Sequence, residues 1–123
     1  MATEKALLEI FGRIESEVAG VIATAVVDLE SGMTLAAKSN RTDFDLAVAS
    51  AYNSELVKQK MKIMRALNLK ATLEDMLITL SDQIHLIKIL PGNNSFLYLA
   101  ADRGSTNLAI LRSAVARHTS GLE

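Results

Sequence analysis

Residues 43–69 form one long helix-forming segment with two separate apolar stripes, and this feature most constrains what the chain can fold into. Residues in an α-helix lie about 100° apart, so the spacing of apolar residues shows which of them share a face. The first stripe consists of Leu46, Val57, Met61 and Met64. The second stripe consists of Ala49, Tyr52, Leu56, Ile63 and Leu67. Asn53 and Lys60 lie between the stripes, which predicts two distinct contact surfaces on one helix.

A small domain covers one of these stripes with its own sheet, so the second stripe predicts a partner. Its three-then-four spacing is typical of a seam between packed helices. The alternative is a single wide apolar face against one sheet, with Asn53 and Lys60 extending their polar ends to solvent. The remaining arc of the helix is polar and is expected to face solvent; it holds Ser54, Glu55, Lys58, Gln59, Lys62 and Arg65.

Composition limits the classes of protein to which the chain can belong. Its 123 residues are expected to form one domain, residues 1–123, without a deep enclosed active site. A formal net charge of -1 and a sequence pI of about 6.1 argue against a nucleic-acid-binding module. The absence of cysteine excludes disulfides and thiolate metal sites and fits a cytoplasmic protein. The chain lacks a signal-peptide apolar region and the ~18-residue apolar run of a membrane span, so no membrane insertion is expected.

Apolar periodicity and turn residues predict the order helix, two strands, helix, three strands, helix. The first helix is expected over residues 3–18, and Thr42 with Asp45 resembles a capping box before the long helix. Ser105 or Thr106 is expected to cap the last helix. The first strand is apolar on both faces, so helices are expected on both sides of the sheet. The strands are expected over residues 21–29, 33–39, 71–81, 84–90 and 95–102.

Three strings in this order resemble the Roadblock family, which includes the dynein light chain of that name and the bacterial MglB type of GTPase regulator. They are AVVDLESGMTLA, LEDMLITLSDQIHLIKIL and FLYLAADRGSTNLAILR. In the last string, Asn107, Leu108 and Arg112 stand where the family pattern has them. The resemblance covers nearly the whole chain. It implies an α/β (α+β) sandwich with a five-stranded, mainly antiparallel sheet, the long central helix on one face and the terminal helices on the other.

The resemblance also implies partners. Roadblock domains form homodimers in which the third strand, here residues 73–80, pairs with its copy and the central helices lie side by side. The dimer interface it implies contains Tyr52, Leu56, Ile63, Leu67, Leu73, Met76 and Ile78. The outer face of the paired helices is implied to bind a Ras-like small GTPase through Glu55, Lys58, Gln59, Lys62 and Arg65.

The search for catalytic chemistry in the sequence is negative. No Gly-Lys pair and no Gly-x-Gly-x-x-Gly turn is present, so neither a P-loop nor a dinucleotide-binding turn is predicted. His85 is expected to be a hydrogen-bonded strand histidine, and His118 lies near a helix C-terminus, where the helix dipole favours it. Glu74 and Asp75 are neighbours on a strand and point to opposite faces, so they cannot share a proton or a metal. We therefore expect no enzyme, cofactor or metal site.

Two other functions remain open from the sequence. A scaffold subunit would join a larger assembly through the same surface without affecting GTPase turnover. A small-ligand sensor of the PAS, GAF or profilin-like kind would need a polar-lined cavity, whereas the strands here are rich in Ile, Leu and Val.

Overall fold

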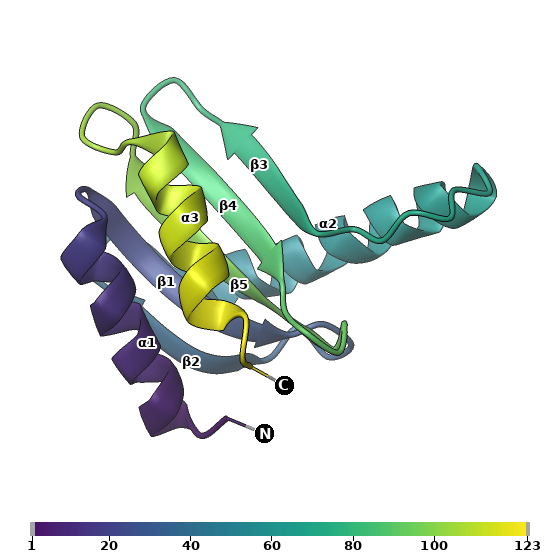
Figure 1. Cartoon of the computed structure of the whole chain (residues 1–123), viewed down its shortest axis with the longest axis horizontal. Helices are drawn as coiled ribbons and strands as arrows, with labels where there is room; N and C mark the ends of the chain where they lie inside the picture. The colour runs from purple at the N-terminus through teal and green to yellow at the C-terminus, as the bar shows by residue number, and fades with distance from the viewer. Residues whose placement is uncertain (1, 123) are drawn as a thin grey trace.

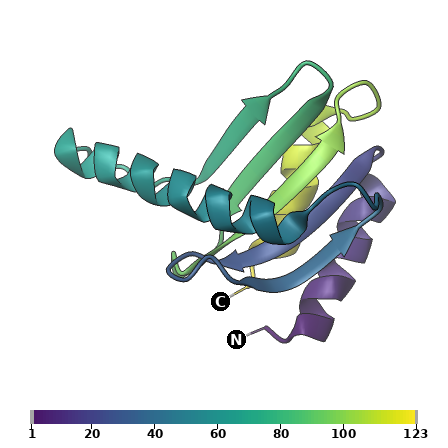
Figure 2. The same cartoon turned by 180° about the vertical axis from the view of Figure 1, so that it is seen from behind.

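Residues 2–122, which the computed structural model describes, form three helices and one five-stranded sheet in the predicted order. Every neighbouring pair in the strand order β2-β1-β5-β4-β3 is antiparallel. α1 and α3 cover one face of the sheet and α2 crosses the other (Figures 1 and 2). The architecture expected from the sequence is therefore confirmed. The elements are α1 (Glu4–Glu17), β1 (Val21–Asp28), β2 (Thr34–Ser39), α2 (Leu46–Ala66), β3 (Asp75–Thr79), β4 (Gln83–Ile89), β5 (Ser95–Asp102) and α3 (Leu108–Thr119).

Side-chain caps set the starts of α1 and α3. Thr3 caps α1 by accepting a hydrogen bond from the Ala6 amide at 3.1 Å. α3 is capped by Asn107, whose side chain accepts from the Ile110 amide at 3.0 Å. The prediction that Ser105 or Thr106 caps α3 is wrong, because both hydroxyls are engaged in the preceding turn. They donate to the Asp102 carboxylate (2.7 Å) and the Ala19 carbonyl (2.8 Å), respectively.

α2 is shorter at both ends than the predicted segment. Its cap is Asp45, which accepts from the Val48 amide at 3.1 Å, so the predicted capping box headed by Thr42 does not form. Asn68 ends the helical path with a φ of 56°, a conformation that Asn tolerates better than most residues. α2 is the longest helix of residues 2–122, and none of their helices is long and apolar enough to cross a membrane.

Small residues bring the first half of α2 close to the sheet. Ser50 and Ser54 are buried on its sheet-facing side together with Leu46 and Val57. The prediction that Ser54 faces solvent is wrong. Its hydroxyl donates to the Leu29 carbonyl at 2.7 Å. The β1–β2 turn therefore satisfies a polar group that helical spacing alone placed on the solvent-facing arc of the helix.

The second half of α2 extends beyond the edge of the sheet. α2 packs on β1 and β2 and then runs past the edge formed by β3 (Figures 1 and 2). The strand order ends at β3, as the resemblance implied. The last turns of α2 and the edge strand β3 therefore lie on the same side of the molecule.

Candidate protein–protein interface

The two stripes of α2 have different surroundings. Leu46 and Val57 of the first stripe are buried against the sheet, and Met61 is partly buried beside them. The second stripe is open except at Ala49, which is partly buried against the sheet. The exposed fractions are 74% for Tyr52, 38% for Leu56, 40% for Ile63 and 63% for Leu67. The structure therefore supports two surfaces on one helix over the single wide face.

The backbone of β3 offers unused hydrogen-bonding groups at the sheet edge. The Glu74 carbonyl accepts from the Ile89 amide (3.0 Å), and the Leu80 amide donates to Gln83 (2.8 Å). Because hydrogen-bonded and outward-facing residues alternate along an antiparallel pair, the N–H and C=O groups of Asp75, Leu77 and Thr79 point away from β4. Each can donate to and accept from a further strand.

The side chains of β3 give this edge an apolar character on both faces. Met76 lies opposite Ile87 and Ile78 opposite His85, which places both on the α2 face, whereas Leu77 packs with the core under α1 and α3. Leu73, just before the strand, is half-buried. The residues implied for a dimer interface thus divide between the exposed stripe of α2 and the β3 edge; their role in an interface stays a prediction.

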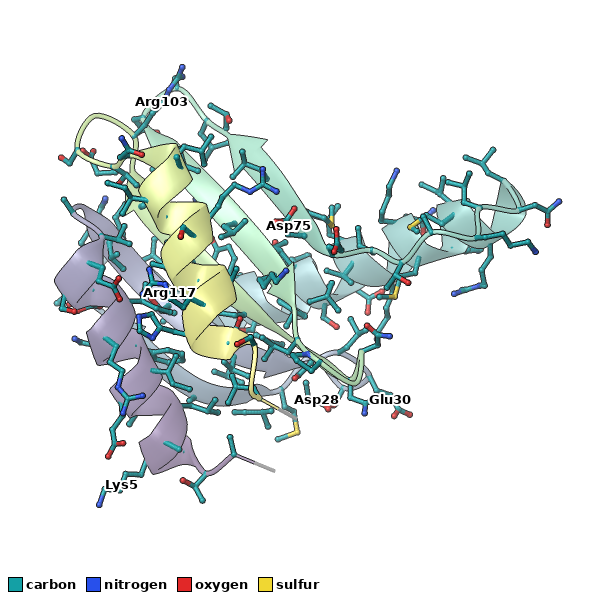
Figure 3. All side chains as sticks on the ribbon, viewed as in Figure 1. Lys5, Asp28, Glu30, Asp75, Arg103 and Arg117 are labelled. Carbon is teal, nitrogen blue, oxygen red and sulfur yellow. The ribbon has the colours of Figure 1, made fainter. Side chains whose placement is uncertain are left out.

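The polar face of α2 is only partly free. The Lys58 ammonium donates to the Glu30 carbonyl at 2.7 Å and lies 3.5 Å from the Glu55 carboxylate, so it is tied to the β1–β2 turn, where Figure 3 labels Glu30. Gln59, Lys62 and Arg65 are exposed, as is Glu55. Within residues 2–122, Lys62 and Arg65 form no ion pair. Of the three cations expected on this face, Lys58, Lys62 and Arg65, only Lys62 and Arg65 are therefore available to a partner.

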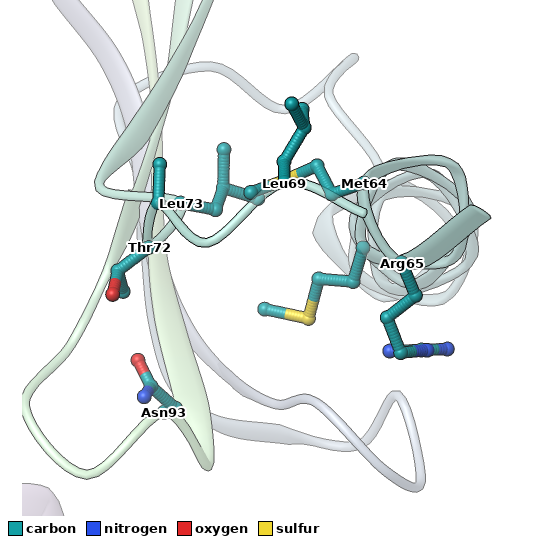
Figure 4. Close-up of a pocket in the computed structure, with 8 residues that line it drawn as sticks. Met64, Arg65, Leu69, Thr72, Leu73 and Asn93 are labelled. Atoms are coloured by element: carbon teal, nitrogen blue, oxygen red, sulfur yellow. The ribbon is translucent and has the colours of Figure 1, made fainter. Parts of the chain in front are cut away.

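A hollow of about 290 Å³ opens beside the projecting end of α2. In Figure 4, Thr72 and Asn93 lie on one side of this hollow and Arg65 on the other. The signal for it in the sequence was the methionine content of the helix, because flexible Met side chains suit adaptable binding surfaces. The hollow depends on the path of residues 67–74, which sequence periodicity does not predict. Its apolar lining consists of Met61, Met64, Leu69, Ala71 and Leu73.

A groove of about 330 Å³ lies at the other end of α2, where three aromatic rings meet. The centroids of His85 and Tyr98 are 5.4 Å apart, and Phe44 lies 6.3 and 6.4 Å from them. Residues of α2 that line the groove are Val48, Ala49, Tyr52 and Asn53.

The predicted hydrogen-bonded strand histidine is confirmed in this groove. Nδ1 of His85 accepts from the Tyr98 hydroxyl (3.1 Å), which leaves Nε2–H to donate to Gln83 Oε1 (2.7 Å). Burial lowers the pKa of His85, because desolvation disfavours its charged form. Burial also raises the pKa of Tyr98 to about 12, so both side chains are neutral at pH 7.

Ion pairs fix α3 to its neighbours. Arg112 contacts both oxygens of Asp75 at 3.1 and 2.9 Å and so joins α3 to the edge strand; Figure 3 labels Asp75. Glu17 accepts from His118 and, at 2.8 Å, from Arg117, and these hydrogen bonds hold the pKa of Glu17 below its usual value. Residues 2–122 contain no cluster of His, Cys, Asp and Glu that could hold a metal.

Comparison with solved structures identifies the same fold in several proteins. The chain is similar to MglB from Myxococcus xanthus, with a TM-score of 0.83 and 13% identity over 97% of this chain and 87% of that one. For a structure described as MglB with a tetrameric arrangement, the TM-score is 0.84 and the sequence identity 14%, over 99% of this chain and 88% of that one. For a Roadblock/LC7 domain from Streptomyces avermitilis, the TM-score is 0.77 and the sequence identity 12%, over 99% of this chain and 95% of that one.

These likenesses show the fold: residues 2–122 adopt the architecture of the MglB and Roadblock/LC7 structures, as the resemblance in the sequence implied. No protein-family model and no curated protein matches the sequence.

Proposed function

We propose that this protein is a homodimeric, non-catalytic regulatory module that binds a Ras-like small GTPase. The observation that carries the proposal is the coincidence of an unpaired apolar strand edge, β3, with the exposed stripe of α2 on one side of the molecule. Either feature alone would favour aggregation. A two-fold axis at the β3 edge protects both at once, because it pairs each strand and each helix with its own copy.

The proposed dimer has a continuous sheet and a pair of central helices. A two-fold axis perpendicular to the sheet makes the two β3 strands antiparallel and keeps both α2 helices on the same face. The outward N–H and C=O groups of Asp75, Leu77 and Thr79 then gain partners. A standard interface buries about 1,600 Å² in total, which a strand pair and a helix pair together can supply.

The GTPase surface is proposed on the outer face of the paired helices, as the resemblance to the Roadblock family implies. Lys62 and Arg65 are the exposed cations there, flanked by Gln59 and Glu55, and the two-fold axis doubles them. Charges at the rim of an interface mainly steer association and set specificity. Lys58 has a different role in this proposal, since it already holds the β1–β2 turn.

Light scattering tests the dimer. The purified protein at low micromolar concentration should show twice the 13.3 kDa chain mass. A single species of 13.3 kDa would contradict the proposal.

A charge-reversal pair tests the GTPase surface. The variant Lys62→Glu with Arg65→Glu should lose capture of Ras-like GTPases from the source organism loaded with a non-hydrolysable GTP analogue. The matched control is Lys5→Glu with Arg13→Glu, which reverses two exposed cations on α1 across the sheet and should capture normally. Undiminished capture by the α2 variant would place the partner on another face. Single-turnover GTP hydrolysis by the captured GTPase then separates a regulator from a scaffold.

A further inference from the structure

The hollow beside the projecting end of α2 has one wall that the end of the helix builds. α2 closes in a Schellman motif, in which the Asn68 amide donates to the Arg65 carbonyl at 3.0 Å. The Leu69 amide donates to the Met64 carbonyl, also at 3.0 Å. Asn68 has the left-handed conformation that the motif requires, with a φ of 56°. The motif holds Leu69 beside the last turn of the helix, and both Leu69 and Met64 line the hollow.

A second turn, between β4 and β5, builds the opposite wall. The Asn93 amide donates to the Leu90 carbonyl at 3.1 Å, and Gly92 has the positive φ (91°) that the third position of a type II turn requires. Asn93, which lines the hollow, follows with a φ of 60°. Among residues 2–122, Asn68 and Asn93 are the only residues other than glycine with a positive φ. Such backbone is concentrated at ligand-binding and other functional sites, and both examples in this chain border the same hollow.

The polar side chains around the hollow are free to bind a ligand. Arg65 forms no ion pair within residues 2–122. In the same part of the chain, the side chains of Arg65, Thr72 and Asn93 take part in no hydrogen bond. The rest of the lining is apolar. A concave apolar surface with a few polar groups around it is the usual form of a small-molecule site.

The charge of this region selects an anionic ligand. Residues 58–70 contain five of the chain's 13 Lys and Arg residues and no Asp or Glu. Of the residues that line the hollow, only Arg65 is charged. Its planar guanidinium can bind a carboxylate through two parallel N–H···O bonds. One guanidinium matches one carboxylate, whereas a phosphate dianion would keep part of its charge unpaired.

We infer that this hollow binds a small aliphatic carboxylate, with the carboxylate on Arg65 and the hydrocarbon chain against Met61, Met64 and Leu73. An apolar cavity of about 150 Å³ holds benzene, so the hollow of about 290 Å³ has room for a chain of about eight carbons. The lining has no aromatic ring, and flexible Met side chains adapt to a flexible ligand. The inference does not rest on the proposed function, although both use Arg65.

Methionine methyl NMR tests the inference directly, with octanoate as the probe. In protein labelled with methyl-¹³C methionine, the signals of Met61 and Met64 should shift and saturate. A dissociation constant of about 1–10 mM is expected for a ligand of about ten non-hydrogen atoms. Met33, which is 68% exposed and lies outside the hollow, is the internal control and should not shift. Met61→Leu and Met64→Leu, which nearly conserve volume, assign the two signals.

Three results of this titration would overturn the inference. The first is no shift of Met61 or Met64 at about 50 mM octanoate, well above the expected dissociation constant. The second is a shift of Met33 as large as theirs, because it would indicate non-specific contact. The third is equal affinity for octylammonium, which has the same chain and the opposite charge and should bind at least about fivefold more weakly. None of these results would bear on the proposed dimer or on GTPase capture.

Two substitutions separate the charge of the site from its space. Arg65→Gln should raise the octanoate dissociation constant about fivefold, as for loss of an exposed charge pair. The matched control Arg13→Gln, at an exposed position on α1, should leave the constant unchanged. Ala71→Phe fills the hollow from an exposed position and should abolish the shifts. Circular dichroism shows that each variant is folded, and wild-type affinity in Arg65→Gln or Ala71→Phe would contradict the site.

Discussion

The two edge strands of the sheet are protected to different degrees. β2 is contacted by helices on both faces, since α1 and α2 both pack against it, and Ala36 is buried there although most of its residues stay exposed. Its Lys38 pairs with Glu15 of α1 at 2.6 Å, and the β1–β2 register shifts between Val26 and Val27. A charged residue and an irregular register both discourage a further strand from pairing.

β3 has a regular register and few of these features. Its ladder with β4 continues without a shift from Asp75 to Thr79, and Met76, Leu77 and Ile78 occupy its centre. The ion pair of this edge, between Asp75 and Arg112, lies at the first residue of the strand and leaves the apolar centre free.

The difference shows that protection of a sheet edge is selective in this molecule. The same chain blunts one edge with charge, irregularity and helix cover, and leaves the other regular and apolar beside an exposed helical stripe. An edge left in this state in a folded protein is typical of a site for association. The following substitutions compare the two sides directly.

The largest expected effect comes from a charge in the exposed stripe. Ile63→Glu on the β3 side should weaken the dimer by about 100-fold or more, because each copy would bury an unpaired carboxylate. Leu35→Glu on β2 is the matched control, since Leu35 is 46% exposed and Ile63 40%. Light scattering over a dilution series measures both. Equal dimer masses for the two variants would remove the distinction between the edges.

Proline at an outward-facing edge position gives a smaller effect. Thr79→Pro removes one outward N–H per copy and should weaken the dimer about tenfold, whereas edge strands tolerate Pro within the protomer. Ala37→Pro makes the corresponding change on β2 and should not alter the dimer dissociation constant. If both variants remain dimers of wild-type affinity, β3 does not pair across the axis.

The ion pairs of the two edges allow a comparison of protomer stability. Lys38→Ala and Arg112→Ala should each lower the free energy of unfolding by about 0.5 kcal/mol at low salt, as for other surface pairs. Arg112→Ala should also weaken the dimer a few-fold, because Asp75 lies on the strand that pairs. Urea unfolding and sedimentation separate the two effects. If Lys38→Ala weakened the dimer and Arg112→Ala did not, the assignment of the dimer interface to the β3 edge would be contradicted.

The smallest expected effect is a change of protomer stability with pH, which depends on His85 of β4, the residue opposite Ile78 of β3. The folded state lowers the pKa of His85, so the unfolded chain binds more protons as the pH falls through 6.5. Stability should therefore fall from pH 7.5 to 5.5, by less than the ion-pair changes above, because His85 is only half-buried and solvent screens its charge. His85→Gln should flatten this slope in urea titrations. If the pH dependence of stability were unchanged in His85→Gln, it would arise from other titratable groups.

Much of the fold could be predicted from periodicity because its elements are regular. The spacing of apolar residues predicted α1, β5 and the two stripes of α2, all within a few residues of the observed bounds. The helix starts were harder. Thr42 was predicted to head a capping box, but the carboxylate of Asp45 lies closer to the first free amides.

The candidate site was only partly predictable, because it depends on contacts between segments far apart in sequence. Helical spacing places Ser54 and Lys58 on the solvent-facing arc of the helix, because it takes account only of the angle of each residue around the helix axis. In the fold, the β1–β2 turn reaches this arc and provides the carbonyls of Leu29 and Glu30 to them. The two hollows at the ends of α2 likewise depend on loop paths, which carry no periodic signal.

The way α2 is mounted has a mechanical consequence. The helix is rooted on β1 and β2 through its first half, and the turns after Val57 extend about 14 Å as a cantilever. A load on the free end acts with leverage on the root, where Ser54 and Lys58 are bonded to the β1–β2 turn. The free end of α2 is therefore linked to the β1–β2 turn through the middle of the same helix, and the hydrogen bonds of Ser54 and Lys58 are the contacts that a displacement of the free end would load first.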